Sequence, residues 1–208
     1  FTDGSSFVLE LGNQVTGASN YYAKVEGKSE VYVLTGTLAG YFFVPKEDFV
    51  SRTLLGTAEE IYPDQSFTSD SMLFDEITLS GTHVPAQVTV TQLTDTTGMS
   101  QAMIESYKYN VTDGTKTALF HTGIASQFYE NFFDITADDV IKALPAQEDL
   151  ESYGLSDPYC TVSLNAGGVR TTLSCSAKDE EGYYYVMKKG YNVIDRVAAD
   201  KLFWAEYT

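Results

Sequence analysis

The sequence predicts an α+β fold of antiparallel β-meanders backed by short helices, with pseudo-repeated units at the two ends of the chain. Short segments rich in Tyr, Val and Thr, joined by Gly-containing turns, are typical of β-hairpins. The helical segments between them are short and end at Gly or Pro. A Tyr-rich hairpin followed by an amphipathic segment occurs near both ends, which indicates a repeated unit.

The N-terminal segment is predicted to form a hairpin followed by short helices. β-branched and aromatic residues occupy both arms of the hairpin, and Gly27-Lys28-Ser29 supplies the turn. Thr35 is in a position to cap the next helix, and Pro45 ends that helix. We expect strands at Ser6–Leu11, Asn20–Glu26 and Glu30–Leu34, and helical segments at Thr35–Phe43 and Lys46–Leu55.

The central segment has strand periodicity first and helix periodicity afterwards. Alternating residues predict strands at Ile77–Ser80, Val88–Leu93 and Met103–Asn110. Apolar residues at a spacing of about 3.6 predict a core-facing helix from Lys116 to Phe133. Asp134, Asp138 and Asp139 cluster at the next helix start, where the helix dipole favours negative charge. Thr136-Ala137-Asp138-Asp139 resembles a capping box there, and that helix ends at Pro145.

The C-terminal third is predicted to be a strand meander that a helix closes. A helical turn at Gln147–Tyr153 ends at Gly154, a residue that accepts the positive φ of a helix C-terminus. The predicted strands are Tyr159–Leu164, Val169–Ser176, Gly182–Lys188 and Tyr191–Asp195, and the closing helix is Val197–Tyr207.

The charge of the chain excludes some classes of function. Its 208 residues contain 13 Lys+Arg and 29 Asp+Glu, for a net charge of −16. Nucleic-acid binding needs clustered Lys and Arg, so this acidity argues against it. No run approaches the ~20 apolar residues of a membrane span. The start at Phe1-Thr2-Asp3 reads as a fragment, and we expect any signal peptide or membrane anchor to lie outside it. We expect three segments, 1–56, 57–133 and 134–208, in one compact domain.

The two cysteines, Cys160 and Cys175, fall in one predicted hairpin around the turn Asn165-Ala166-Gly167-Gly168. If Leu164 lies opposite Val169, the two cysteines occupy diagonal positions, ~7–8 Å apart and too far for an unstrained disulfide. We therefore expect two buried, reduced thiols. Neither cysteine has a CxxC partner or a nearby His, so a metal or redox site is not indicated.

The two ends of the chain share a pattern. The segment from Tyr21 to Gly27 (YYAKVEG) matches the segment from Tyr184 to Gly190 (YYVMKKG), and each is followed by a second strand and an aromatic amphipathic tail. The alternative explanation is chance similarity between two Tyr-rich hairpins.

The segment that precedes the second Tyr-rich hairpin resembles a known protein family. The segment Asp149–Pro158 (DLESYGLSDP), followed by a hairpin and then by Gly182–Val186, resembles the bacterial family catalogued as domain of unknown function 4340. Members of that family show a Tyr-Gly-Leu-x-x-Pro signature followed by strands and a Tyr-Tyr-x-Lys segment. The resemblance covers Ala137–Tyr207 well, Phe7–Phe42 moderately and the middle poorly, and the cysteine pair departs from the family pattern. It implies a protein outside the cytoplasm, anchored to the bacterial membrane or envelope and in some cases an accessory of ABC transporters. It carries over no catalytic residues.

No motif in the sequence indicates an enzyme. The chain lacks the GxSxG, HExxH and P-loop patterns, and His83 and His121 lie in no recognisable triad. Asp179, Glu180 and Glu181 read as a solvated hairpin tip, since an EF-hand pattern is absent. We expect no cofactor and no metal. A hydrolase that uses a carboxylate pair stays open, although no local signal nominates the pair.

Aromatic residues are the candidate binding residues. Tyr183 and Tyr185 share one face of a predicted strand, so one aromatic face is directed to solvent or to a partner. Exposed tyrosines suit protein or glycan contacts because they offer a large area at low entropic cost. Ordinary cross-strand packing is the alternative. The candidates are Tyr22, Tyr183, Tyr185 and Trp204.

The sequence therefore predicts a non-catalytic module outside the cytoplasm that makes protein–protein contacts. The expected partner is a protein of the cell envelope. A glycan- or peptidoglycan-binding module with a tyrosine-lined surface is the alternative.

Overall fold

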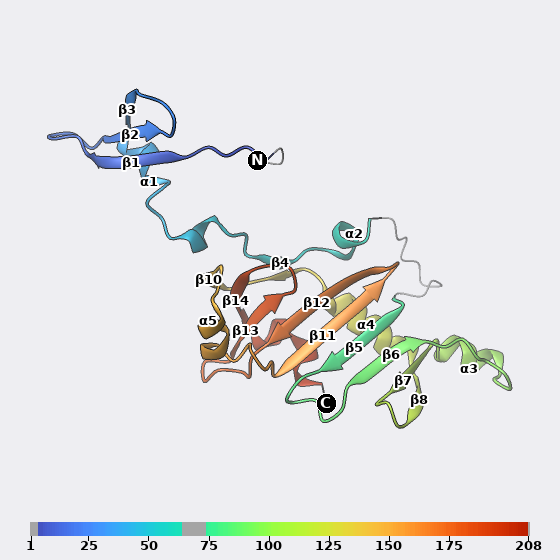
Figure 1. Cartoon of the computed structure of the whole chain (residues 1–208). Coiled ribbons are helices and arrows are strands. Elements are labelled where there is room, and N and C mark those ends of the chain that lie inside the picture. The colour runs from blue at the N-terminus through green and yellow to red at the C-terminus, as the bar shows by residue number, and fades with distance from the viewer. Residues whose placement is uncertain (1–3, 64–73, 208) are drawn as a thin grey trace. The chain divides into compact units, whose positions relative to one another are not determined.

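The structure is a computed structural model that describes residues 4–63 and 74–207. The fold is α+β: antiparallel strands dominate, and five short α-helices accompany them in the described part (Figure 1). The chain divides into two compact units, Phe1–Phe49 (unit 1) and Val50–Thr208 (unit 2). This division lies at Phe49, and the expected segments of one compact domain, with boundaries at 56 and 133, stay a prediction.

Unit 1 is a three-stranded antiparallel meander with a short helix. The strand order is β1-β2-β3, and the β2–β3 hairpin agrees with the sequence prediction. The Thr35 hydroxyl accepts a hydrogen bond from the Leu38 N–H at 3.3 Å, so the predicted N-cap is confirmed. The elements are β1 (Leu9–Gln14), β2 (Tyr21–Val25), β3 (Val31–Leu34), α1 (Gly36–Gly40) and the 3₁₀ turn η1 (Lys46–Phe49).

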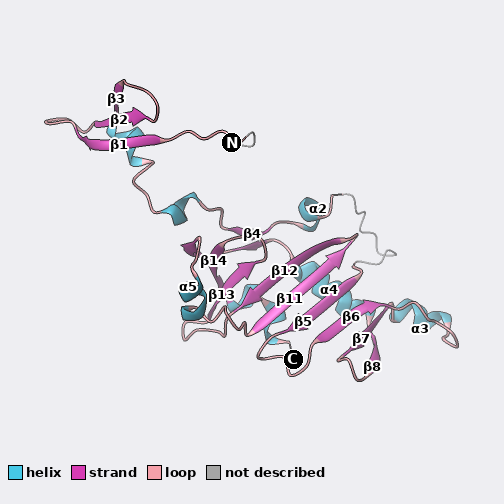
Figure 2. Ribbon diagram, in the orientation of Figure 1, coloured by secondary structure: helices cyan, strands magenta, loops and turns pink. Residues whose placement is uncertain are grey.

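Unit 2 is built on a nine-stranded antiparallel sheet of order β10-β14-β13-β12-β11-β5-β6-β7-β8, with a separate two-stranded pair β4-β9 (Figure 2). The large sheet comprises β5 (Glu76–Ser80), β6 (Val88–Gln92), β7 (Tyr109–Thr112), β8 (Thr117–Phe120), β10 (Asp139–Ala143), β11 (Cys160–Ala166), β12 (Val169–Cys175), β13 (Tyr183–Lys188) and β14 (Val193–Ala198). The pair is β4 (Thr53–Leu55) and β9 (Ile135–Thr136). The helices are α2 (Ala58–Ile61), α3 (Gln101–Ser106), α4 (Thr122–Phe132) and α5 (Gln147–Ser152), with 3₁₀ turns η2 (Ala199–Lys201) and η3 (Phe203–Glu206).

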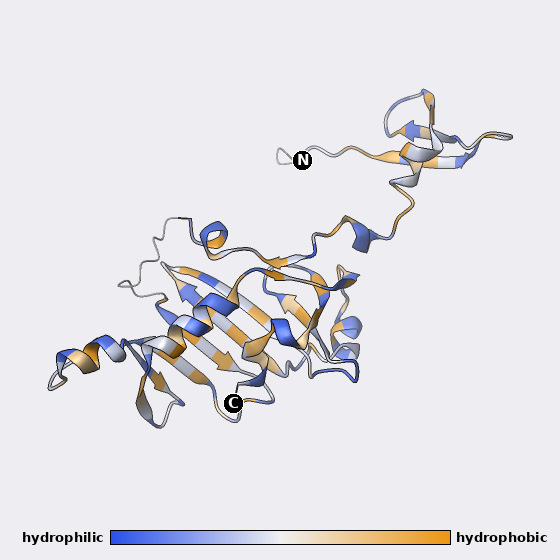
Figure 3. Cartoon of the chain, turned by 180° about the vertical axis from the view of Figure 1, so that it is seen from behind, coloured by the Kyte–Doolittle hydropathy of each residue, from blue (hydrophilic) through white to orange (hydrophobic). Residues whose placement is uncertain are grey.

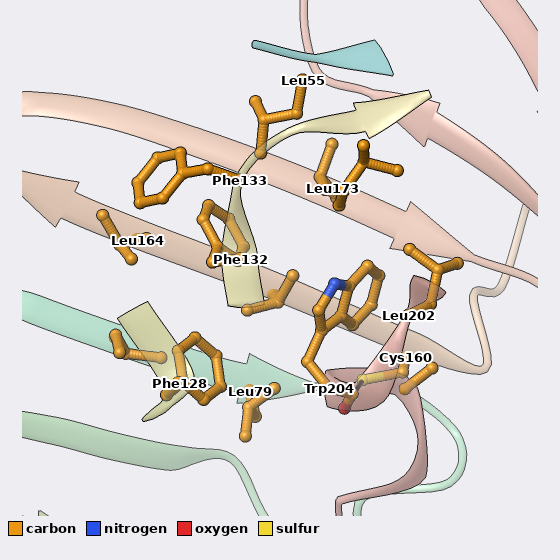
Figure 4. Packing of buried hydrophobic residues seen from close by; sticks show 14 of the residues in the cluster. Leu55, Leu79, Phe128, Phe132, Phe133, Cys160, Leu164, Leu173, Leu202 and Trp204 are labelled. Carbon is orange, nitrogen blue, oxygen red and sulfur yellow. Dashed lines mark hydrogen bonds between the residues drawn. The ribbon is translucent and has the colours of Figure 1, made fainter. Parts of the chain in front are cut away.

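The core of unit 2 lies on one face of the large sheet. Phe128 and Phe132 of α4 and Trp204 of η3 pack toward Leu164 of β11 and Leu173 of β12 (Figure 4). All five side chains are buried. A sheet needs cover on its apolar face only, so one helix and a few turns suffice here.

Two central predictions are corrected. The predicted strand Met103–Asn110 begins instead as α3, because the Ser100 hydroxyl accepts from the Met103 N–H and caps a helix. The predicted helix from Lys116 to Phe133 is shorter, because its first residues form β8 and His121 caps α4 through its Nδ1.

Two predictions near the C-terminal half are also corrected. The expected helix after Thr136 is β10, an edge strand, and the expected helix Val197–Tyr207 is the end of β14 followed by 3₁₀ turns. Asp138 does not cap a helix; it accepts hydrogen bonds from the Ala198 N–H at 2.8 Å and from Lys201 at 2.7 Å. The capping-type side chain thus binds a distant segment of the chain.

The register of the cysteine hairpin differs from the expected one. Gly167 and Gly168 both have positive φ, of 56° and 79°, as the two central residues of a type I′ turn require. Ala166 therefore lies opposite Val169, and Cys160 lies directly opposite Cys175. The diagonal placement was wrong, but both cysteines are free and buried, as expected.

The terminal hairpins share one register. Tyr21 pairs with Leu34, and Tyr184 pairs with Val197. Tyr184 follows Tyr21 by 163 positions and Val197 follows Leu34 by the same number, so the two hairpins pair equivalent positions. The likeness that the sequence indicates therefore extends to how these two hairpins pair. That the whole terminal units repeat one another stays a prediction.

Candidate functional site

One face of the large sheet lies opposite α4 and is rich in hydroxyl side chains. α4 lies on the other face, behind the sheet in Figure 1 and in front of it in Figure 3. A row of Ser and Thr crosses six neighbouring strands, with each residue directly opposite the next. We call this face the open face and this set the hydroxyl row. The hydroxyl row consists of Thr172, Ser163, Thr78, Thr89, Thr112 and Thr117.

Strand alternation places the hydroxyl groups on the open face. In β11, Thr161 and Ser163 alternate with the apolar Val162 and Leu164, so the two kinds of residue take opposite faces, although Ser163 is itself buried. The Ser163 hydroxyl hydrogen-bonds to that of Thr172. Because neighbouring strands lie ~4.8 Å apart, the row offers uncharged donors and acceptors at a regular spacing.

An aromatic group occupies the open face nearer its β10 edge. Tyr183 and Tyr185 alternate with the buried Tyr184 and Val186, as the sequence predicts. Tyr153, which follows α5, packs against Tyr185 with ring centroids 4.7 Å apart. We name this set, completed by the arginine described next, the tyrosine group: Tyr153, Tyr183, Tyr185 and Arg196.

Arg196 lies over Tyr183, with its guanidinium carbon 3.9 Å from the ring centroid. It forms ion pairs with Asp179 at 3.1 Å and with Glu181. The Tyr183 N–H donates to Asp179, and this bond together with Arg196 lowers the pKa of the Asp179 carboxyl. The acidic hairpin tip expected to be merely solvated therefore neutralises Arg196, and the tyrosine group presents an aromatic rather than a cationic surface.

Tyr22 belongs to unit 1 and not to the tyrosine group. It lies on β2 opposite Val33 and is 44% exposed. A hollow of about 230 Å³ beside it is lined by Tyr22, Val31, Gly12 and the cross-strand pair Glu10 and Lys24. Its surface is therefore mixed apolar and charged.

Unit 1 exposes most of its large apolar side chains. Among the described residues of unit 1, only Ala23 and Ala39 are buried hydrophobic residues. Twelve of the nineteen exposed large hydrophobic residues in the described part of the chain belong to it. They are Phe7, Val8, Tyr22, Val31, Tyr32, Val33, Leu38, Tyr41, Phe42, Phe43, Val44 and Phe49.

Trp204 is fully buried in the core of unit 2 (Figure 4). Its backbone carbonyl oxygen lies 3.8 Å from the Cys160 sulfur, and its indole Nε1 has no hydrogen-bond partner in the part of the chain that the structure describes. A ligand on the surface cannot reach this side chain in the conformation described. Of the four aromatic candidates, the structure therefore brings together only Tyr183 and Tyr185.

Both histidines have structural contacts. His83 stacks on Tyr159 with ring centroids 4.3 Å apart, and His121 caps α4. Within residues 4–63 and 74–207, no cluster of three or more His, Cys, Asp or Glu side chains is arranged to hold a metal ion.

Sequence reasoning missed the hydroxyl row, Tyr153 and Arg196. Alternating Thr and Ser in segments such as Val88–Gln92 (VTVTQ) was a visible signal for hydroxyl-bearing strand faces. That six strands would align these residues depends on the register of distant segments, which no local pattern encodes.

No family model, curated protein or solved structure matches the chain. In the part of the chain that the structure describes, no helix has the length and apolar character needed to span a membrane.

Proposed function

We propose that this protein is a non-catalytic module that binds another protein through unit 1, outside the cytoplasm at the bacterial envelope. The observation that carries the proposal is the concentration of exposed large apolar residues in unit 1. Exposed apolar clusters of this kind are typical of interaction sites.

The residues on the Tyr22 side of the unit 1 sheet are suited to a protein contact. Tyr22 and Val33 are directly opposite each other, and Val31 follows on the same face. Aromatic side chains that become desolvated in an interface supply much of its binding free energy. Lys24 and Glu10 beside them would form the polar rim.

The edge of the unit 1 sheet offers a second means of recognition. Among the described strands β3 pairs only with β2, in the order β1-β2-β3, so its other edge has no strand partner there. Its sequence, VYVL, contains neither a charged residue nor Pro, the usual protections of an edge strand. We therefore propose that the partner adds an extended segment to β3.

The test uses a variant that makes this surface polar. Tyr22→Ser, Val31→Thr and Val33→Thr together keep strand-compatible residues but remove apolar area. The control variant changes exposed residues of unit 2, Val169→Thr and Tyr191→Ser. Each protein is used as bait in native envelope extract, and sedimentation velocity of the purified chain measures self-association.

The proposal predicts that the purified chain is a monomer. It also predicts that the natural chain and the unit 2 control both retain the same envelope protein from the extract, and that the unit 1 variant does not. Equal retention by all three baits would contradict it. Self-association abolished by the unit 1 variant would also contradict it, because the surface would then be covered by a second copy.

A second candidate function is glycan binding on the open face. The hydroxyl row and the tyrosine group carry it, because sugars are bound by hydroxyl hydrogen bonds and by stacking on aromatic rings. Thr78→Val and Thr89→Val remove two hydroxyls while preserving shape, and Thr37→Val in unit 1 is the matched control. This function is supported if the Thr78→Val, Thr89→Val variant loses binding to insoluble peptidoglycan while the natural chain and Thr37→Val keep it. Equal binding by all three proteins, or no binding by the natural chain, argues against it.

The envelope location and the repeated terminal units are also proposals. The acidic, Tyr-rich composition and the resemblance of Asp149–Pro158 support the location, and the shared hairpin register supports the repeat. Fractionation of cells that express the natural protein tests the location: recovery in the cytoplasmic fraction would overturn it.

A further inference from the structure

An apolar cavity lies between α4 and strands β5 to β8 in unit 2. Its volume is about 190 Å³. The floor comes from sheet residues such as Leu79 and Val90, and Phe128 of α4 forms part of the wall. Ile124 and Tyr207, which are 46% and 45% exposed, also line it and mark the side that opens to solvent.

The chemistry of the lining selects an apolar occupant. Nearly all lining side chains are aliphatic or Phe, and the Tyr207 hydroxyl is the single polar side-chain group among them. Apolar cavities of ~150 Å³ stay free of water and bind benzene-sized molecules. By this comparison the cavity has room for an aliphatic chain of about six to eight carbons.

A second hollow adjoins the cavity and is lined in part by a lysine. It measures about 210 Å³ and shares Val88 and Val111 with the cavity. Lys116, in the turn between β7 and β8, lines it and forms no ion pair with any described residue. Asp113 also lines it, but its carboxylate accepts the Lys116 and Thr115 N–H groups of its own turn.

We propose that unit 2 binds a medium-length aliphatic carboxylate, with the chain in the cavity and the carboxylate at Lys116. The apolar chain replaces water contacts by contacts with the cavity wall, and the unpaired ammonium group attracts the head group. This site is separate from the unit 1 surface, so it and the proposed protein contact succeed or fail independently; Thr112 and Thr117 of the hydroxyl row also line the hollow.

The first test is a series of carboxylates of increasing length, from butyrate to dodecanoate, titrated by calorimetry into the full chain. Each added CH₂ should raise the affinity about fourfold until the cavity is full, at about eight carbons. Saturable 1:1 binding with this plateau supports the proposal. Absence of saturable binding, or affinity that rises without a plateau, overturns it.

The second test uses variants in pairs. Val111→Phe fills the junction of cavity and hollow, whereas Val169→Phe adds the same ring at an exposed position of β12. Octanoate affinity should fall at least tenfold in the first and stay unchanged in the second. Equal affinity in both overturns the cavity as the site, and thermal unfolding confirms that each variant is folded.

Lys116→Ser tests the head group, with exposed Lys189→Ser as control. We expect octanoate to bind several-fold more weakly to Lys116→Ser, while octanol binds equally to both variants. An equal loss for octanol, or no loss for octanoate, overturns the role of Lys116.

Discussion

At the scale of single residues, Asp195 conflicts with its surroundings. It lies on β14 directly between Val140 of β10 and Val186 of β13, and it is 4% exposed. Its Oδ1 has no hydrogen-bond partner among the described residues. Burial raises the pKa of this carboxyl from 3.8 to about 6. A charge in such a site is costly because nothing replaces its lost hydration.

We expect the Asp195→Asn variant to be more stable than the natural chain at pH 7. The pKa of Asp195 is higher in the folded state than in the unfolded state, so the protonated carboxyl makes a favourable contribution to the free energy of unfolding. This contribution is fully present below pH 4. That contribution is lost as the pH rises from 4 through 6, in total about 3 kcal/mol. Removing the charge should therefore raise the free energy of unfolding at pH 7 by about 1–3 kcal/mol and flatten its fall between pH 4 and 7.

Chemical denaturation at several pH values measures this effect. The control is Asp157→Asn, at an exposed position, where we expect a change within about 0.5 kcal/mol. If the difference in unfolding free energy between the natural chain and Asp195→Asn does not change between pH 4 and 7, the burial argument is contradicted.

Gly81 holds a backbone position that no other residue fits. Its φ is 133°, and a Cβ there would lie 2.5 Å from the Tyr159 carbonyl oxygen. Gly81→Ala should therefore cost about 3 kcal/mol or more. Gly98→Ala is the control: its φ of 79° is also positive, but the space around it is open, so we expect a loss of about 1 kcal/mol. Equal losses in urea denaturation would show that the close contact is unimportant.

At the scale of elements, the β11–β12 hairpin fixes the chemistry of the cysteines. Cys160 and Cys175 are directly opposite each other and both are fully buried. Burial raises the pKa of Cys160 to about 11 and also raises that of Cys175. The reactive thiolate is therefore scarce at neutral pH.

We expect neither thiol to react with an aromatic disulfide reagent in the native protein at pH 8. Both should react once the chain is unfolded in denaturant without reductant. Rapid reaction of the native protein would contradict the burial of the pair, and no reaction after unfolding would show that the two cysteines are bonded.

Several elements with local determinants were predicted well, although the Ser100 cap of α3 and the turn at Gly167-Gly168 were missed, and elements with distant determinants were not predicted. The β2–β3 hairpin, the Thr35 cap and the end of α5 at Gly154, with φ of 68°, depend on turn and cap chemistry within a few residues. The segment after Thr136 has capping residues but is a strand, because Asp138 bonds to Ala198 and Lys201 instead. Tertiary hydrogen bonds thus override the local pattern.

The same limit applies to the candidate site. Alternation in β13 sufficed to place Tyr183 and Tyr185 on one face. The burial of Trp204 was not predictable, since it depends on η3 packing beneath strands that are distant in sequence. The partners of Tyr183 and Tyr185 come from β14 and from the residue after α5, and both depend on the tertiary fold.

At the scale of the whole molecule, the buried apolar residues are distributed very unequally. Nearly all of them belong to unit 2, which forms one continuous hydrophobic cluster. Such a cluster supports independent folding, whereas a three-stranded sheet with two buried alanines does not.

A fragment of residues 50–208 should therefore fold alone. We expect its circular dichroism melt to show one cooperative transition within a few degrees of that of the full chain, and residues 1–49 alone to show none. A fragment 50–208 without a cooperative transition would show that unit 1 is needed for the fold of unit 2.

The position of Trp204 has a practical consequence. It is the single tryptophan of the chain, and it lies in the dry interior of unit 2. Fluorescence excited at the red edge of the tryptophan absorption band therefore reports on unit 2 alone, since the tyrosines of unit 1 do not absorb there. A change in this emission when a tryptophan-free peptide binds unit 1 would mean that a signal has passed from one unit to the other.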